Sequence, residues 1–156
     1  MNPQPSPHPD VGGVSDERLA LIADSHLRLT GRTLVAAAGD LRSALWNAGA
    51  VIVAHGTEAD PVFFYGNRQA LALFEMDWAS FVKMPSRLSA EVLLREERAR
   101  VLERVSRDGF IGDYAGIRVS SSGKRFRIEQ ALVWNLLDAF GVCHGQAATF
   151  DRWTPA

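Results

Sequence analysis

Two short apolar runs near the middle of the chain set the pattern around which the other elements are arranged. Residues 50–54 are uninterrupted by a polar side chain and include three β-branched residues, which favours a strand buried on both faces. A polar turn follows, and residues 62–65 then form an aromatic run that predicts a second strand. Strands this close in sequence are expected to pair antiparallel. Asn67 is expected to cap a helix whose apolar residues recur at helical spacing.

Helical patterns lie on both sides of these strands. Upstream, a helix is expected from Ser15 or Asp16 to Gly31, and Asp40 is expected to cap a second, shorter one. Downstream, a longer helix rich in Arg and Glu is expected to begin at Ser86 or Ser89 and to end at Gly109. The stripe of this longer helix that we expect to be buried consists of Leu94, Val101 or Leu102, and Val105.

The remainder of the chain has the period-two pattern of a β-meander. Strands are expected over residues 114–119, 125–134 and 142–150, with turns at 120–123 and 138–141. Strict alternation along the middle strand divides its side chains between two faces. One face is expected to hold Phe126, Ile128, Gln130, Leu132 and Trp134, and the other Arg125, Arg127, Glu129, Ala131 and Val133. The predicted fold is α+β, a five-stranded antiparallel sheet with helices packed on one face and an added N-terminal helical segment.

Length and composition are consistent with one globular domain. The chain has 156 residues, of which 47% are hydrophobic and 22% charged. The proline-rich residues 1–14 are interpreted as a disordered tail, and residues 15–156 as a single domain with N-terminal helices over 15–48 and a core over 50–150. A net charge of −1 gives no electrostatic footprint for nucleic acid or an anionic membrane.

The cellular setting is inferred from segments that the sequence lacks. No apolar run approaches the roughly 20 residues of a membrane span, and the first residues lack the basic start and apolar core of a secretion signal. The single cysteine, Cys143, fits a reducing compartment. We therefore expect a cytoplasmic protein.

Several sequence words, in fixed order, resemble those of the MEKHLA domain family, which has a PAS-like sensor fold. They include residues 27–32, 54–56, 60–67, 73–78, 85–90, 116–120, 123–128, 133–138 and 145–150. The resemblance begins near residue 16 and implies a stand-alone bacterial type of a domain that also ends plant class III homeodomain–leucine zipper proteins. It implies a sensor of light, oxygen or redox state and brings no catalytic residue set. DNA binding is not implied, because this chain has no homeodomain, zipper or basic region.

The residues that could carry chemistry identify no cofactor. A flavin photosensor of the PAS class that reacts through a thiol needs a cysteine on the helices after Asn67, and residues 67–87 contain none. Cys143 falls on the last predicted strand, where we expect it to be a small buried residue. The four histidines have no ligand spacing, so no metal site is expected, although haem ligation through His55 or His144 is conceivable.

Eight residues are the candidates for a ligand pocket under the helices. They are His55, Phe64, Asn67, Phe74, Trp78, Phe81, Arg87 and Trp134. Each also has a structural interpretation. The aromatic residues could simply fill the core, His55 could end a strand, and Asn67 could be only a helix cap. Arg87 could bind an acidic ligand or pair with Glu75 or Asp77.

Three functions remain open at this point. The first is a non-catalytic sensory domain that binds a small apolar or planar ligand and acts through a homodimer or a signalling partner. The second is an interaction or dimerisation module with a filled core, using Leu19, Ile22, Leu27 and Val133 as its surface. The third is a small enzyme, which requires His55 to converge with Asp60 or Glu75 inside a cavity.

Overall fold

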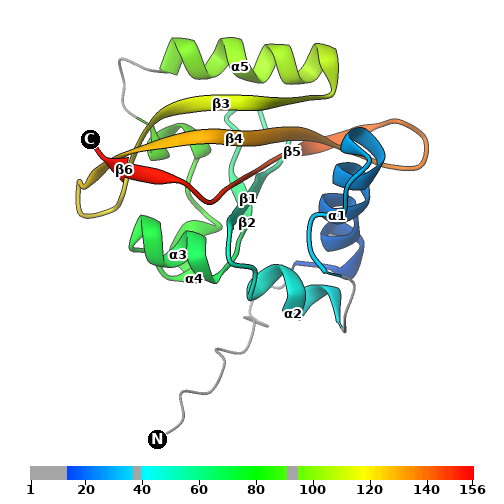
Figure 1. Cartoon of the computed structure of the whole chain (residues 1–156), viewed down its shortest axis with the longest axis horizontal. Coiled ribbons are helices and arrows are strands. Elements are labelled where there is room, and N and C mark those ends of the chain that lie inside the picture. Colours follow the sequence, from blue (N-terminus) through cyan, green and yellow to red (C-terminus); the bar gives the residue numbers. More distant parts are fainter. Residues whose placement is uncertain (1–13, 37–39, 91–94) are drawn as a thin grey trace, which may run out of the picture.

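The computed structural model describes residues 14–36, 40–90 and 95–156 (Figure 1). The predicted tail therefore lies outside the described residues except for Val14, which is buried. The helices are α1 (Asp16–Thr30), α2 (Leu41–Trp46), α3 (Arg68–Phe74), α4 (Trp78–Phe81), the 3-10 helix η1 (Ser86–Ser89) and α5 (Arg95–Asp108). The strands are β1 (Val51–His55), β2 (Phe63–Gly66), β3 (Phe110–Val119), β4 (Arg125–Leu137), β5 (Cys143–Phe150) and β6 (Trp153–Pro155).

All the strands form one antiparallel sheet, which confirms the predicted α+β class. The strand order is β2-β1-β5-β4-β3, so the first and last strands of the core lie together at the centre. The short strand β6 was not predicted. It pairs with the beginning of β4, whereas β5 pairs with the end of the same strand. Figure 1 shows α5 running along β3, while α1 lies beside the hairpin that joins β4 to β5.

The ends of α1 follow the capping signals. Ser15 is the N-cap and its side chain accepts a hydrogen bond from the Arg18 amide at 3.2 Å. Gly31 ends the helix with φ of 75°, a left-handed conformation that costs glycine little because it has no Cβ. Asp40 caps α2 as expected, although that helix ends at Trp46, before Gly49.

The predicted start of the long helix is wrong. Ser86–Ser89 form only the 3-10 helix η1, after which Ala90 is extended and bridges to Arg118 of β3. The α-helix described begins at Arg95 and ends as expected before Gly109. Leu94 of the predicted stripe lies outside the described residues, whereas Val105 is fully buried.

A β-bulge in β4 reverses the predicted alternation of its side chains. Gln130 has φ of 51°, and the register with β3 shifts by one residue at this point. Phe126 and Ile128 therefore share a face with Ala131 and Val133, not with Trp134 as strict alternation requires. The prediction was wrong because the pattern of apolar residues does not reveal the extra residue that a bulge inserts.

Helices cover both faces of the sheet, and each face has its own apolar cluster. On the cavity face, α3, α4 and α5 cover the residues Val51, Val53, Phe63, Phe74, Phe81, Val105, Ile111, Tyr114, Phe126, Ile128, Ala131, Val133 and Phe150. On the α1 face, α1 and α2 cover Leu19, Ile22, Leu45, Trp46, Ile52, Ala54, Tyr65, Trp78, Trp134, Leu136 and Ala147. The N-terminal helices thus cap the sheet.

Candidate functional site

A cavity of about 60 Å³ lies on the cavity face, between the sheet and its covering helices. Its walls are mostly apolar and come from all five core strands together with α3, η1 and α5. The apolar side chains include Val53, Phe63, Phe74, Val101, Ile128, Val133 and Phe150. The polar side chains are His55, Ser89, Tyr114, Arg118 and Gln146. An apolar cavity with a few polar groups is the usual form of a small-molecule site.

Tyr114 and Arg118 form one polar wall of this cavity. They lie on β3 on either side of Gly116, and Arg118 donates a hydrogen bond from Nη2 to the Tyr114 hydroxyl at 2.8 Å. The guanidinium carbon lies 5.2 Å from the centre of the Tyr114 ring. A Cβ on Gly116 would lie only 2.5 Å from the Tyr114 hydroxyl oxygen. The missing side chain at Gly116 therefore lets the tyrosine hydroxyl reach along the strand, over Gly116, to the arginine.

The other polar wall is formed where β1 and β5 run side by side. His55 is buried at the end of β1, and its Nδ1 donates to the carbonyl of Gly56 at 3.0 Å. Gln146 pairs with His55 in the sheet and donates to the Asn135 side chain at 3.0 Å. Ser89 lies instead at the end of η1, which contacts β3; it donates to the carbonyl of Ser86 at 2.7 Å, so its oxygen can still accept a hydrogen bond.

The structure divides the predicted aromatic residues between the two faces. Phe74 lines the cavity, and Phe81 packs on Phe74 and Phe63 at ring-centre distances of 5.9 and 4.4 Å. Trp134 lies on the α1 face, where it is fully buried and donates from Nε1 to the carbonyl of Ile22 at 3.1 Å. Trp78 belongs to the same cluster as Trp134.

Phe64 also lies on the α1 side, against an arginine of the N-terminal helix. The guanidinium carbon of Arg18 is 4.4 Å from the centre of its ring, a cation–π distance. Phe64, Trp78 and Trp134 are therefore absent from the cavity wall, whereas Phe74 and His55 are part of it.

Asn67 connects the two faces of the sheet. It caps α3 as predicted, because its Oδ1 accepts from the Ala70 amide at 3.1 Å. The same oxygen accepts from Ile52 at 3.1 Å, and Nδ2 donates to the carbonyls of Leu45 and Ala50 at 3.1 and 2.8 Å. These four bonds use the full hydrogen-bonding capacity of a fully buried amide. The side chain holds α2, β1 and α3 together.

Arg87 lies at the surface and pairs with Asp60. Its Nε donates to both carboxylate oxygens at 3.0 Å, and both side chains are about half exposed. An exposed pair of this kind contributes about 0–1 kcal/mol. The salt bridge was expected, but with Glu75 or Asp77 as the partner. Neither Asp60 nor Glu75 lines the cavity, so the cluster required for the enzyme interpretation is not assembled around His55.

Glu75 fastens the turn between β3 and β4 to the end of α3. Its carboxylate accepts hydrogen bonds from the hydroxyls of Ser120, at 2.7 Å, and Ser122, and it pairs with Lys124 at 3.4 Å. The two serine hydroxyls, foremost that of Ser122, lower the pKa of Glu75 to about 2. Residues 120–123 thus form the expected hairpin turn, and their serines also dock that turn on the cavity-face helices.

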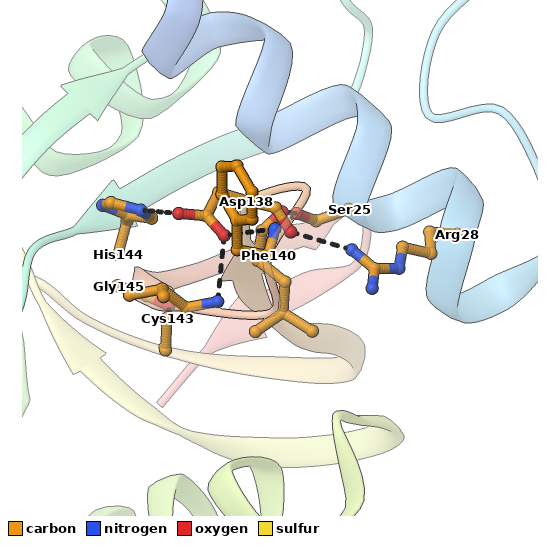
Figure 2. Close-up of polar contacts among 9 residues, drawn as sticks. Ser25, Arg28, Asp138, Phe140, Cys143, His144 and Gly145 are labelled. Carbon is orange, nitrogen blue, oxygen red and sulfur yellow. Dashed lines mark hydrogen bonds and ion pairs between the residues drawn. The ribbon is translucent and has the colours of Figure 1, made fainter.

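The hairpin between β4 and β5 is built around Asp138 (Figure 2). Its carboxylate accepts from His144 Nε2 at 2.8 Å and from the amides of Phe140 and Val142 at 2.8 and 3.0 Å. The hydrogen bond from His144 is the main reason why the pKa of Asp138 is lowered. Cys143, expected to be buried, is instead exposed at the start of β5. The prediction for Cys143 was wrong because the first residues of β5 project beyond the packed part of the sheet and are exposed.

The same hairpin holds α1 through backbone groups (Figure 2). Arg28 donates from Nη1 to the carbonyl of Asp138 at 3.0 Å. The hydroxyl of Ser25 accepts from the Leu137 amide at 2.8 Å and donates to the Leu137 carbonyl at 3.2 Å. Because β5 continues from this hairpin into the cavity wall, the hairpin links the cavity to α1.

Sequence reasoning missed Tyr114 and Arg118 as residues of the cavity wall. The available signal was the sequence Tyr-Ala-Gly-Ile-Arg over residues 114–118 of a predicted strand. Residues two apart in a strand share a face, so a tyrosine, a glycine and an arginine at this spacing place an arginine beside an apolar core. The part of the chain that the structure describes contains no group of three or more His, Cys, Asp or Glu able to hold a metal ion. Within that part, no helix is long and apolar enough to cross a membrane.

Solved structures of sensory domains share this fold. The PAS domain of a Colwellia psychrerythraea protein superposes with a TM-score of 0.61 at 12% identity, covering 72% of this chain and 91% of that one. A Rhodobacter sphaeroides LOV protein has a TM-score of 0.60 at 6% identity, covering 88% and 67%. A light-oxygen-voltage domain studied with a flavin analogue has a TM-score of 0.56 at 16% identity, covering 76% and 86%.

At these identities the similarity shows the fold alone. No curated protein matches the chain. The model of the MEKHLA domain, however, matches residues 16–155, which is nearly all of the part that the structure describes. The chain therefore belongs to the MEKHLA domain family and has a PAS-like fold.

Proposed function

We propose that this protein is a sensory domain that binds a small ligand in the cavity under α3 and α5 and works by binding, without catalysing a reaction. The observation that carries the proposal is the cavity itself, an apolar space with polar groups at its walls between the sheet and the helices of a PAS-like domain. The ligand would contact Phe74 and Val133 through its apolar part. His55, the other predicted site residue in the wall, would contact the other end of the ligand.

The contacts of β5 provide a route from this cavity to the rest of the molecule. Gln146 and Ala148 line the cavity, and the same strand leads back to the hairpin that holds Ser25 and Arg28 of α1. A ligand that binds more tightly to one arrangement of this strand shifts the population toward that arrangement. We propose that α1 and the hairpin deliver the response to a homodimer partner or a signalling protein in the cytoplasm.

Binding of small molecules to the purified protein tests the proposal. Backbone amide NMR shifts on addition of small apolar and amphipathic compounds should concentrate at residues of the cavity wall. The matched control is Ala148→Leu, which fills the cavity from β5, because Ala148 lines it and is partly buried. Binding should be lost in this variant while α1-face signals remain. Binding that persists unchanged in a folded Ala148→Leu protein would contradict the proposed location.

Native mass spectrometry and absorbance of protein purified without added cofactor supply a second measurement. A molecule retained from the cell would appear as a mass shift that Ala148→Leu removes. The light, oxygen or redox interpretation further requires this molecule to be a chromophore or a redox group. A colourless, redox-inactive ligand would therefore be consistent with a sensory domain but would contradict sensing of light, oxygen or redox state.

A second candidate function, partner binding without a ligand, is supported by exposed apolar side chains. Phe140 is 91% exposed and Val142 54% at the tip of the β4–β5 hairpin, and Leu27 of α1 is 46% exposed. The other residues predicted for this surface, Leu19, Ile22 and Val133, are buried within the protein's own clusters. The double variant F140S/V142S, examined by analytical ultracentrifugation beside the wild type, should shift a dimer to a monomer if the hairpin makes the contact.

A further inference from the structure

Among the described residues that line the cavity, Arg118 is the permanently charged one. Arg118 is partly buried and lines the cavity, yet no carboxylate of the described residues forms an ion pair with it. Within the described residues, Arg118 donates hydrogen bonds to two neutral oxygens, the Tyr114 hydroxyl at 2.8 Å and the carbonyl of its neighbour Ile117 at 3.2 Å. A partly desolvated guanidinium gains most from an anionic partner.

The hydrogen-bonding capacity of this wall is only partly used. A guanidinium has five N–H groups, and Arg118 commits one on Nη1 and one on Nη2 to these two oxygens. The Tyr114 hydroxyl accepts from Arg118, so its own proton is available for another acceptor. The remaining N–H groups of Arg118 and the hydroxyl of Tyr114 are neighbouring donors, because the two side chains are hydrogen-bonded to each other. Such a pair of donors matches the two oxygens of one carboxylate.

The apolar lining and the volume of the cavity determine what the rest of the ligand can be. Most of the remaining lining is apolar and includes Phe74, Phe150 and Ile128, which pairs with Gly116 on the neighbouring strand. The cavity volume of about 60 Å³ is less than half that of a roughly 150 Å³ engineered cavity that binds benzene. The tail that fits is therefore short, about two or three carbon atoms.

On these grounds, and resting on the proposed function, we propose that the ligand is a small carboxylic acid with a short apolar tail. Its carboxylate binds to the Arg118 guanidinium and the Tyr114 hydroxyl, and its tail lies between Phe74, Ile128 and Phe150. Gly116 is a positioning residue in this site, because a Cβ there would displace the tyrosine hydroxyl.

Matched acids and amides test the head group directly. Propionate and butyrate are titrated beside propionamide and butyramide, which have the same tails without the negative charge, with affinities from NMR shifts of cavity-wall amides. The acids should bind about ten- to a hundredfold more tightly, the range of a charge-assisted bidentate pair over a neutral one. Amides that bind as tightly as acids would overturn the carboxylate proposal and leave the proposed ligand-binding function standing. Failure of all four probes to shift cavity-wall signals would also overturn the carboxylic-acid proposal, whereas the ligand-binding function is tested separately with the wider set of compounds and Ala148→Leu.

Three variants assign the contact to its residues. Arg118→Gln should abolish the preference for acid over amide, and Tyr114→Phe should reduce it severalfold while keeping the ring in the wall. Arg87→Gln is the matched control, because it removes an arginine that pairs with Asp60 outside the cavity and should leave the preference unchanged. If Arg118→Gln unfolds the protein, Gly116→Ala is the second test. Its Cβ would displace the Tyr114 hydroxyl, so the preference for acid over amide should be lost although Arg118 is still present. An acid preference that survives in folded Arg118→Gln or Gly116→Ala would contradict the proposal.

Discussion

The two faces of the sheet are both covered by helices, but they differ in how completely they are filled. The α1 face packs three tryptophans closely, and Trp134 is fully buried with its indole hydrogen-bonded to α1. The cavity face is lined by phenylalanine and aliphatic side chains and leaves a void beside Arg118. A filled face favours rigid attachment of α1, whereas an incompletely filled face can admit a ligand without first displacing protein atoms.

Neighbouring residues of β4 provide the sharpest test of this contrast. Trp134→Ala removes a large side chain from the filled face and should lower the free energy of unfolding by about 3–5 kcal/mol. Val133→Ala enlarges an existing void on the other face and should cost only about 1–2 kcal/mol. Urea denaturation measures both. Equal losses would show that the two faces are packed alike.

Asn67 tests whether the faces are held together by a single side chain. Asn67→Ala removes a helix cap and leaves buried backbone groups of Leu45, Ala50 and Ile52 without this partner, so we expect a loss of about 3 kcal/mol. Chemical denaturation gives the value. Asn67→Ser retains a cap oxygen and should recover about 1 kcal/mol of it. A loss near 1 kcal/mol for Asn67→Ala would mean that the side chain acts as a cap alone.

The bulge at Gln130 decides which residues of β4 belong to which face. Its positive φ is unfavourable for a side chain with a Cβ by about 1–2 kcal/mol and is most unfavourable for β-branched residues. Gln130→Gly should therefore be as stable as the wild type or up to about 1 kcal/mol more stable, and Gln130→Val about 1–2 kcal/mol less stable. Thermal unfolding of the pair measures the difference. A stable Val variant would contradict the bulge geometry.

Glu75 gives the cavity face a pH dependence through the turn that it anchors. Its pKa is lowered from 4.5 to about 2 in the folded protein, so its stabilising effect is complete above the unfolded value and is lost as pH falls from 4.5 toward 2. Glu75→Gln should be less stable than the wild type at pH 7, and the gap should narrow across this window. Unfolding free energies at pH 7, 4 and 2.5 test this. Glu129→Gln, which alters an exposed pair, is the control and should show no such narrowing.

Much of the fold could be predicted because its signals are local. Caps at Ser15 and Asn67, the apolar run that became β1, and the turns of the meander depend on residues close in sequence, and each is confirmed. The predicted start of the long helix was wrong. Serine is a common N-cap residue, but the backbone from Ser86 continues only as a single 3-10 turn. Composition alone does not distinguish these conformations.

The site was less predictable because its members come from distant segments. Phe74 and His55 were chosen by residue type, and both line the cavity. Trp134 was chosen in the same way, but it lies on the α1 face, because the bulge at Gln130 reverses the alternation of side chains along β4. Arg118 was passed over because an arginine on a strand is usually solvent-exposed. Its position in an apolar wall depends on Gly116 and on the packing of five strands, which no local pattern encodes.

The attachment of α1 to the β4–β5 hairpin has a consequence for how relatives of this protein can diverge. Ser25 and Arg28 contact the backbone of Leu137 and Asp138, not their side chains. Substitution of exposed hairpin residues such as Phe140 therefore leaves these contacts in place. Evolution can alter the tip of the hairpin, and with it the surface offered to other molecules, while the domain beneath keeps the same connection to its N-terminal helix.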